Sequence, residues 1–281
     1  MRIFIIAHRA LTIAFCLLFC LPTAYAEGAA EKQESTAAPV RPVSSGLIDP
    51  AGSTIGTRVQ VPEGYTRVSA APGSFEEFLR SQPLRPHGTR VKYFDGREKR
   101  SEGIYCAVID RSIGNRDLEQ CADALMRIRA EYLYAQKRYS EIQFAFLHDG
   151  KPRRYVDYAG KDRSYKTFLK YMDFIFSSAN TTSFYRELKP VTNLQEIKIG
   201  DIFIQKHRPI NHAMMVVDMA VHSQTGEKIF LLAQSYMPAQ ETQIVINPGS
   251  DSLSPWYSAN FGEVLDTPEW RFSPATDLRK F

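Results

Sequence analysis

The sequence predicts an α+β fold in which helices pack on a largely antiparallel β-sheet. Residues 117–137 and 164–176 carry apolar side chains at spacings of three and four, which is typical of amphipathic helices. The apolar segments 202–204, 213–220 and 228–234 follow one another after short connections and have the length of strands. Short connections favour antiparallel pairing, and helices packed on such a sheet give the α+β class.

The first 26 residues have the pattern of a secretory signal peptide. Arg2 and Arg9 are followed by an apolar run over residues 11–21 and by the small-x-small sequence Ala24-Tyr25-Ala26. The cysteines of this segment lack the small neighbour of a lipoprotein signal. We therefore expect cleavage at about Ala26 and a soluble, exported protein that is periplasmic or secreted.

Charge and hydropathy narrow the classes of partner. The formal net charge is +4, and cleavage of residues 1–26 removes two arginines and no acid, which leaves +2. Such a balance argues against nucleic acid as a partner. No later segment reaches the roughly 18 uninterrupted apolar residues of a membrane helix, so we expect no transmembrane segment in the mature chain.

The mature chain divides into a tether and one domain. Residues 27–53 are rich in Ala, Glu, Ser, Pro and Gly and have few large apolar side chains to offset the entropy of ordering, which predicts a flexible tether. Aromatic and β-branched residues recur from residue 54 to the end. We therefore expect a single α+β domain over residues 54–281.

The first third of this domain is predicted to contain short elements. Residues 58–68 alternate as a strand does, and residues 74–80 have a helical pattern behind a serine cap. Residues 89–94 predict a strand that enters a turn at Asp95-Gly96, and residues 105–109 predict another buried strand.

The strongest predicted helix covers residues 117–137. Asp117 is the expected N-cap, with Gln120 three residues later. Cys121 falls on the apolar face, so we expect it to point inward from the first turn.

The remaining elements follow the same patterns. Residues 141–147 predict a strand and residues 183–188 a short helix. The tail, with its aromatic and proline residues at 254–257 and 267–272, has no periodicity and predicts a loop lying over a surface.

Three polar residues suggest cysteine chemistry. A helix N-terminus favours the thiolate of Cys121 through its unpaired amides and its dipole. His212 precedes an apolar strand and could accept the thiol proton. Antiparallel pairing of residues 213–220 with 228–234 brings Gln234 near His212, where its amide could orient the ring as asparagine does in papain-like enzymes.

Structural explanations remain open for each of the three. Cys121 could be an inert core thiol or form a disulfide with Cys106, and a permanent bridge would exclude catalysis. His212 could cap a strand end through a backbone hydrogen bond, and Gln234 could be a hydrogen-bonding residue at the edge of the sheet. No pattern typical of metal ligands occurs, so we expect no metal and no cofactor.

Part of the chain resembles the NlpC-type branch of papain-like peptidases and amidases. The matching pieces are Cys121 with Ala122-Asp123-Ala124, the strand start Gly200-Asp201-Ile202-Phe203, and residues 212–217 from His212 onward. The Asp-Cys-Ser-Gly context usual in that branch is absent. The resemblance implies a papain-like core with Cys121 as nucleophile and His212 as base, and the strand pairing described above adds Gln234 as the orienting residue.

The domain as a whole resembles a bacterial family known as domain of unknown function 4846. The residues that carry this resemblance are 117–132, 200–204, 212–220, 231–240 and 254–257. It implies a shared fold, while the family label supplies no chemistry.

From these observations we predict an exported papain-like cysteine hydrolase or acyl-transfer enzyme that acts on an amide-type bond. Peptidoglycan is the expected partner. We expect Asp201, Met214, Tyr236 and Trp256 to contact the substrate. One alternative is a non-catalytic cell-envelope binding module on the same scaffold. Another is a glycan-acting enzyme with paired carboxylates, for which the aromatic residues of the tail could stack on sugars.

Overall fold

The computed structural model describes part of the chain, residues 45–101, 103–206 and 210–281. The predicted signal peptide and most of the predicted tether lie outside the described residues. Within the described part, no helix has both the length and the apolar character that crossing a membrane requires.

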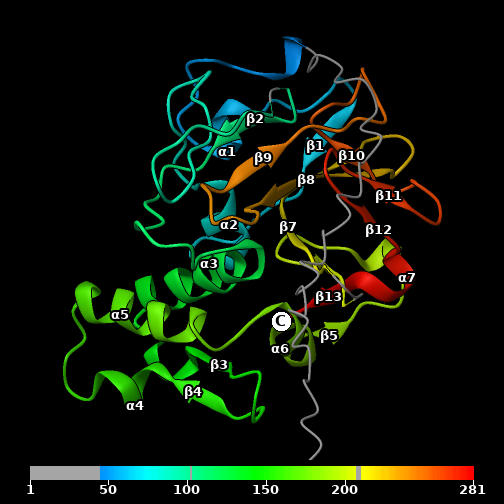
Figure 1. Ribbon diagram of the computed structural model, residues 1–281. Coiled ribbons are helices and arrows are strands. Elements are labelled where there is room, and N and C mark those ends of the chain that lie inside the picture. The colour runs from blue at the N-terminus through cyan, green and yellow to red at the C-terminus, as the bar shows by residue number, and fades with distance from the viewer. Residues whose placement is uncertain (1–44, 102, 207–209) are drawn as a thin grey trace, which may run out of the picture. The chain divides into compact units, whose positions relative to one another are not determined.

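Among the described residues, a nine-stranded sheet forms the centre of the domain, and all of its strand pairs are antiparallel (Figure 1). Its main path runs in the order β2 (Tyr105–Val108), β9 (Gln243–Val245), β8 (Lys228–Gln234), β7 (Ala213–His222), β6 (Ile202–Ile204), β13 (Leu278–Lys280) and β5 (Lys189–Pro190). In addition, β1 (Tyr65–Arg67) pairs with β7, and β10 (Tyr257–Ser258) pairs with β8. The predicted antiparallel sheet and α+β class are confirmed.

Helices and two small hairpins complete the domain. The α-helices are α1 (Ile55–Arg58), α2 (Phe75–Arg80), α3 (Cys121–Ala135), α4 (Tyr155–Ala159), α5 (Tyr165–Phe176), α6 (Thr181–Glu187) and α7 (Pro274–Asp277). The short 3₁₀ helices are η1 (Ser45–Leu47), η2 (Tyr139–Glu141) and η3 (Leu194–Glu196). The hairpins pair β3 (Gln143–Ala145) with β4 (Pro152–Arg154), and β11 (Leu265–Asp266) with β12 (Arg271–Phe272).

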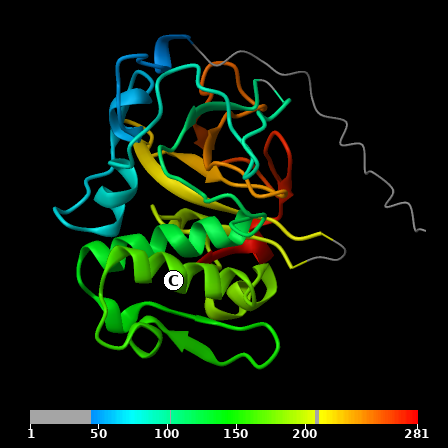
Figure 2. The same ribbon diagram turned by 60° about the vertical axis from the view of Figure 1, so that its left-hand side comes forward.

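The helix α3 lies between the sheet and the other long helix. It packs against β7 and β8, and its Tyr134 ring lies 4.6 Å from the Phe168 ring of α5, measured between centroids. In Figures 1 and 2 the green segments, which run from α3 to α6, lie together on one side of the yellow and orange strands. The first residue of α3 therefore faces the central strands directly.

Several predicted elements are confirmed because their apolar patterns are strong. The predicted helix over residues 164–176 is α5, with Ser164 as N-cap and its predicted core side buried. The strands β6 and β8 have the predicted bounds, and β7 is two residues longer than predicted, since it continues to His222.

The start of α3 differs from the prediction. Its N-cap is Gln120 and not Asp117. The Asp117 carboxylate instead accepts a hydrogen bond from the backbone N–H of Ala239 at 2.7 Å, so it joins a distant loop to the segment before the helix. Cys121 consequently becomes the first helical residue.

In the first third, one predicted strand is much shorter than predicted and another is replaced by isolated bridges. Residues 58–68 divide into the end of α1, a turn at Pro62–Gly64 and the short β1, because Thr54 caps a helix that the alternating pattern conceals. Residues 89–94 form isolated bridges in place of a strand, although the predicted turn at Asp95-Gly96 is present.

The two ends of the described domain contribute more to the hydrophobic core and the central sheet than the sequence predicts. Leu47, within the segment predicted as tether, is buried in the hydrophobic core, and Ile48 forms a bridge with Val59. The tail is not only a surface loop: β10 and β13 are strands of the central sheet, and Trp256 is fully buried. These strands form because their backbone pairs with neighbouring strands. They are too short to show an alternating pattern of apolar residues in the sequence.

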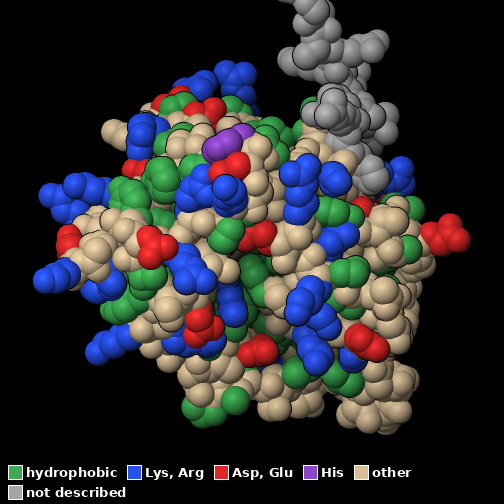
Figure 3. All heavy atoms as spheres, turned by 90° about the horizontal axis from the view of Figure 1, so that it is seen from below, with side chains coloured by type: hydrophobic (Ala, Val, Ile, Leu, Met, Phe, Trp, Pro, Cys, Tyr) green, Lys and Arg blue, Asp and Glu red, His purple; other side chains and the backbone are tan. Residues whose placement is uncertain are grey.

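The surface carries both signs of charge. Figure 3 shows Lys and Arg side chains spread over the face seen from below, with Asp and Glu side chains among them. Neither sign occupies a single separate patch in this view.

Candidate active site

Cys121 occupies the first position of α3, against the start of β7. Its Sγ lies 3.9 Å from Thr181 Oγ1 and donates to the backbone carbonyl of Asn211 at 4.0 Å. The backbone N–H of Ala213 also faces the sulfur and favours its thiolate form. The sulfur therefore contacts the backbone on both sides of His212.

The thiol is protonated in this arrangement. Cys121 is 4% exposed, and burial, together with the Asp123 carboxylate, raises its pKa to about 11. Asp123 follows two residues later, and burial raises the pKa of its carboxyl group to about 8. The helix N-terminus is thus not sufficient to hold a thiolate at neutral pH, and a base is needed to remove the proton.

His212 is fully buried and hydrogen-bonded to Gln234. Its Nε2 lies 2.8 Å from Gln234 Oε1. The register of β7 and β8 explains this contact: Met215 lies opposite Ala233, so Gln234 lies opposite Met214 and diagonal to His212 on the same face. The predicted proximity of the two side chains is present.

The second ring nitrogen of His212 is available for chemistry. Nδ1 has no hydrogen-bond partner among the residues that the structure describes. Burial, and to a smaller extent the charge of Lys99, lowers the pKa of His212 to about 4, while the bond to Gln234 opposes this shift. The imidazole is therefore neutral at pH 7 and can accept a proton.

Sequence reasoning missed Lys99 and Glu269 at this site, and it considered Trp270 only as an aromatic residue of the tail that could stack on sugars. Glu269 Oε2 accepts hydrogen bonds from Gln234 Nε2 and from Lys99 Nζ, each at 2.7 Å. The Trp270 ring lies 5.0 Å from the His212 ring, measured between centroids. Glu269 and Trp270 lie in the turn of the β11–β12 hairpin, within the tail predicted as a surface loop. No local pattern connects that turn to β8 or to Lys99.

The four predicted substrate-contacting residues lie in different places. The Tyr236 ring is 4.9 Å from the His212 ring, and Met214 is buried on the same face of β7. Asp201 directly precedes β6, at the end of that strand farther from His212. Its backbone carbonyl accepts a hydrogen bond from the backbone N–H of Val216, and its carboxylate accepts one from the backbone N–H of Lys198.

Trp256 is placed elsewhere as well. Its indole N–H donates to the backbone carbonyl of Gln60, and Arg67 lies over its ring. The structure therefore brings Tyr236 and Met214 to the site, but not Asp201 or Trp256. Trp270 is the tryptophan beside His212.

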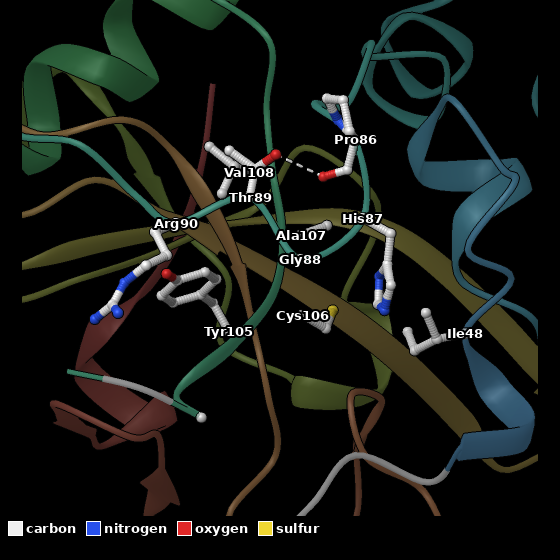
Figure 4. A pocket seen from close by; sticks show the side chains of 11 residues that line it. Ile48, Pro86, His87, Gly88, Thr89, Arg90, Tyr105, Cys106, Ala107 and Val108 are labelled. Atoms are coloured by element: carbon white, nitrogen blue, oxygen red, sulfur yellow. Dashed lines mark hydrogen bonds between the residues drawn. The ribbon is translucent and has the colours of Figure 1, made fainter. Parts of the chain in front are cut away.

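The second cysteine of the domain is separate from this site. Cys106 and Cys121 are both free thiols, so the disulfide considered from the sequence is not formed. Cys106 lines a cavity of about 390 Å³, together with Ile48 and residues 86–90, 103, 105, 107 and 108. Figure 4 shows the His87 and Cys106 side chains at this cavity. Burial raises the pKa of Cys106 to about 12.

Comparison with known proteins identifies a family whose description names no activity. A family model described as "Domain of unknown function (4846)" matches residues 55–160 and 148–280. No curated protein and no solved structure matches the chain. Any chemistry has to be argued from the side chains described above.

Proposed function

This chain belongs to the domain of unknown function 4846 family, and we propose that it is an exported cysteine hydrolase or acyl-transfer enzyme with a papain-like, NlpC-type active site. One observation carries this proposal. The Cys121 sulfur lies against the backbone on both sides of His212, and the His212 ring is held by Gln234 through Nε2. This combination sets a thiol against the backbone that carries the proposed base, and an amide on the ring of that base, which supports the assignment of nucleophile, base and orienting residue.

The chemistry requires a change in the resting site. Among the described residues no hydrogen bond joins Cys121 Sγ to His212 Nδ1, and pKa values of about 11 and about 4 keep the proton on sulfur. Substrate binding has to bring Nδ1 to the thiol; the imidazole then accepts the Cys121 proton, and the thiolate attacks the acyl carbon of an amide. The amine leaves with the proton that the His212 imidazolium returns, and the acyl group remains on sulfur as a thioester. Water then releases a carboxylate, or a second amine takes the acyl group. Because Cys121 is only 4% exposed, substrate has to displace covering groups to reach it.

The substrate class rests on the predicted export signal. An exported hydrolase for amides meets the peptide stems of peptidoglycan, and the NlpC-type resemblance favours the same substrate. The third candidate, a glycan-acting enzyme, is less supported. It needs two free carboxylates across a cleft. Asp218, an acidic residue of the central strand β7, is not free in this sense, because it is fully buried and bound by Arg67 and Arg80 at 2.8 and 2.7 Å.

Digestion of purified muropeptides by the mature chain tests this proposal. Liquid chromatography with mass spectrometry is expected to show products that gain one water for each amide bond cleaved, together with a new free amine. The His212→Asn variant, which keeps a polar side chain but has no base, is expected to leave the muropeptides intact.

The alternatives give different results in the same assay. Intact muropeptides, combined with cosedimentation of the chain with whole sacculi, would identify a binding module. New reducing ends with every amide intact would identify a glycan-acting enzyme. Either result contradicts the proposed hydrolase.

A further inference from the structure

We propose that Glu269 and Lys99 are positioning residues: their ion pair fixes the direction of the Gln234 amide, and the amide in turn fixes which nitrogen of His212 carries the proton. The proposal rests on the proposed function only where it assigns His212 as the base. The tautomer itself is a property of the folded protein that can be measured without a substrate.

The contacts form one continuous chain. Lys99 Nζ and Gln234 Nε2 each lie 2.7 Å from Glu269 Oε2, and Gln234 Oε1 lies 2.8 Å from His212 Nε2. The side chain of Lys99 is 3% exposed and that of Glu269 is 19% exposed, so the ion pair is largely shielded from water. The four residues come from four separate segments of the chain.

The direction of each hydrogen bond follows from what each group can donate. An ionised carboxylate only accepts, so the atom of Gln234 that faces Glu269 has to be the amide nitrogen. The amide oxygen then faces His212, and this oxygen only accepts. The Nε2 atom of a neutral His212 must therefore carry the proton, and Nδ1 keeps its lone pair.

A glutamine without the ion pair would not make this selection. The oxygen and nitrogen of an amide are nearly equal in size, and a reversed Gln234 would donate to Nε2 and force the proton onto Nδ1. Gln243, which lies opposite Gln234 in the pairing of β8 with β9, does not hold the amide, because neither of its side-chain atoms has a partner among the described residues. The carboxylate of Glu269 is thus the group that distinguishes the two directions.

Lys99 contacts the same oxygen of that carboxylate. Its Nζ lies 2.7 Å from Glu269 Oε2, the atom that also accepts from Gln234 Nε2, and because an ammonium only donates, the atom between the two donors has to be an acceptor. Burial lowers the pKa of Lys99. Burial raises the pKa values of Tyr236, beside the ring, and of Cys121 to about 12 and 11, so both groups are neutral at pH 7. Among the described residues, Lys99 and Glu269 are the charged groups with a hydrogen bond in this chain of contacts.

The test is a long-range ¹H–¹⁵N correlation spectrum of the mature chain labelled at histidine, recorded at pH 7. The spectrum of His212→Asn assigns the His212 signals by their loss. The wild type is expected to show His212 with Nε2 protonated and Nδ1 unprotonated. The double variant Lys99→Met/Glu269→Gln replaces both charges by neutral side chains of similar length and is expected to populate the Nδ1-protonated form.

The kinetic readout distinguishes positioning from substrate binding. The double variant is expected to lower kcat for muropeptide cleavage by roughly tenfold with KM unchanged, because the base is in the wrong tautomer for part of the time. Glu263→Gln is the matched control. Glu263 is exposed and lies six residues before Glu269, and its replacement is expected to change neither the tautomer nor kcat.

A double variant that keeps Nε2 fully protonated overturns this proposal, whether or not the chain cleaves muropeptides. If the tautomer shifts while the wild type cleaves nothing, the positioning role stands and the proposed hydrolase fails. Should the double variant not fold, Lys99→Gln/Glu269→Gln supplies the comparison. Neither of these amides fixes the direction of Gln234, so the Nδ1-protonated form should again appear. Its absence in that variant overturns the proposal equally.

Discussion

Replacing Cys121 with alanine is expected to lower the rate of muropeptide amide cleavage by roughly 10⁴-fold or more, because it removes the thiol on which the acyl intermediate forms. The side chain is small and buried, so the variant should keep its fold, which its circular dichroism spectrum checks. The initial rate of amine release from a purified muropeptide is the measurement.

Cys106→Ala is the matched control for this change. Cys106 is also a free thiol with a raised pKa, but it lines a separate cavity and lies outside the hydrogen bonds around His212. Its replacement should leave the rate within about twofold of the wild type, as expected for a change outside the active site. Equal product from wild type and Cys121→Ala would contradict the assignment of the nucleophile.

The second large effect is on stability. Asp218→Ala is expected to lower the free energy of unfolding by about 3–5 kcal/mol, because it leaves two arginines without their buried partner. The Asp218 side chain is fully buried in β7 and bridges Arg67 of β1 and Arg80 at the end of α2. Urea unfolding monitored by tryptophan fluorescence gives the value.

Asp173→Ala provides the comparison for Asp218. Asp173 of α5 pairs with Arg116, and both side chains are at least half exposed, so its loss should change the unfolding free energy by less than about 1 kcal/mol. If Asp218→Ala is as mild as Asp173→Ala, the two arginines do not depend on this carboxylate. The role given to Asp218 in fixing β1 and α2 to the sheet would then be wrong.

Local patterns in the sequence predict the elements on which the candidate site stands. The three- and four-residue spacing of α3 and the short connection between β7 and β8 are sufficient to place Cys121 at a helix start. They also place Gln234 near His212. These features depend on residues close together in the chain, where periodicity and turn length carry the information.

The rest of the site depends on contacts between distant segments. Lys99, Gln234 and Glu269 meet only after the β11–β12 hairpin folds against β8, and none of them has a distinctive local pattern. The sequence offers two tryptophans, and only the fold determines that Trp270 lies beside His212 while Trp256 packs against Gln60. Short strands such as β13 are likewise fixed by their neighbours and not by their own residues.

The most direct test of the cysteine active site is to locate the atom that reacts with a substrate-like electrophile. The mature chain is treated with a vinyl sulfone analogue of the peptidoglycan stem peptide, digested and mapped by mass spectrometry. We predict one thioether, on Cys121, formed much more slowly in the His212→Asn variant because the thiol then lacks its base. Labelling of Cys106 in place of Cys121, or equal rates in wild type and His212→Asn, would contradict the account.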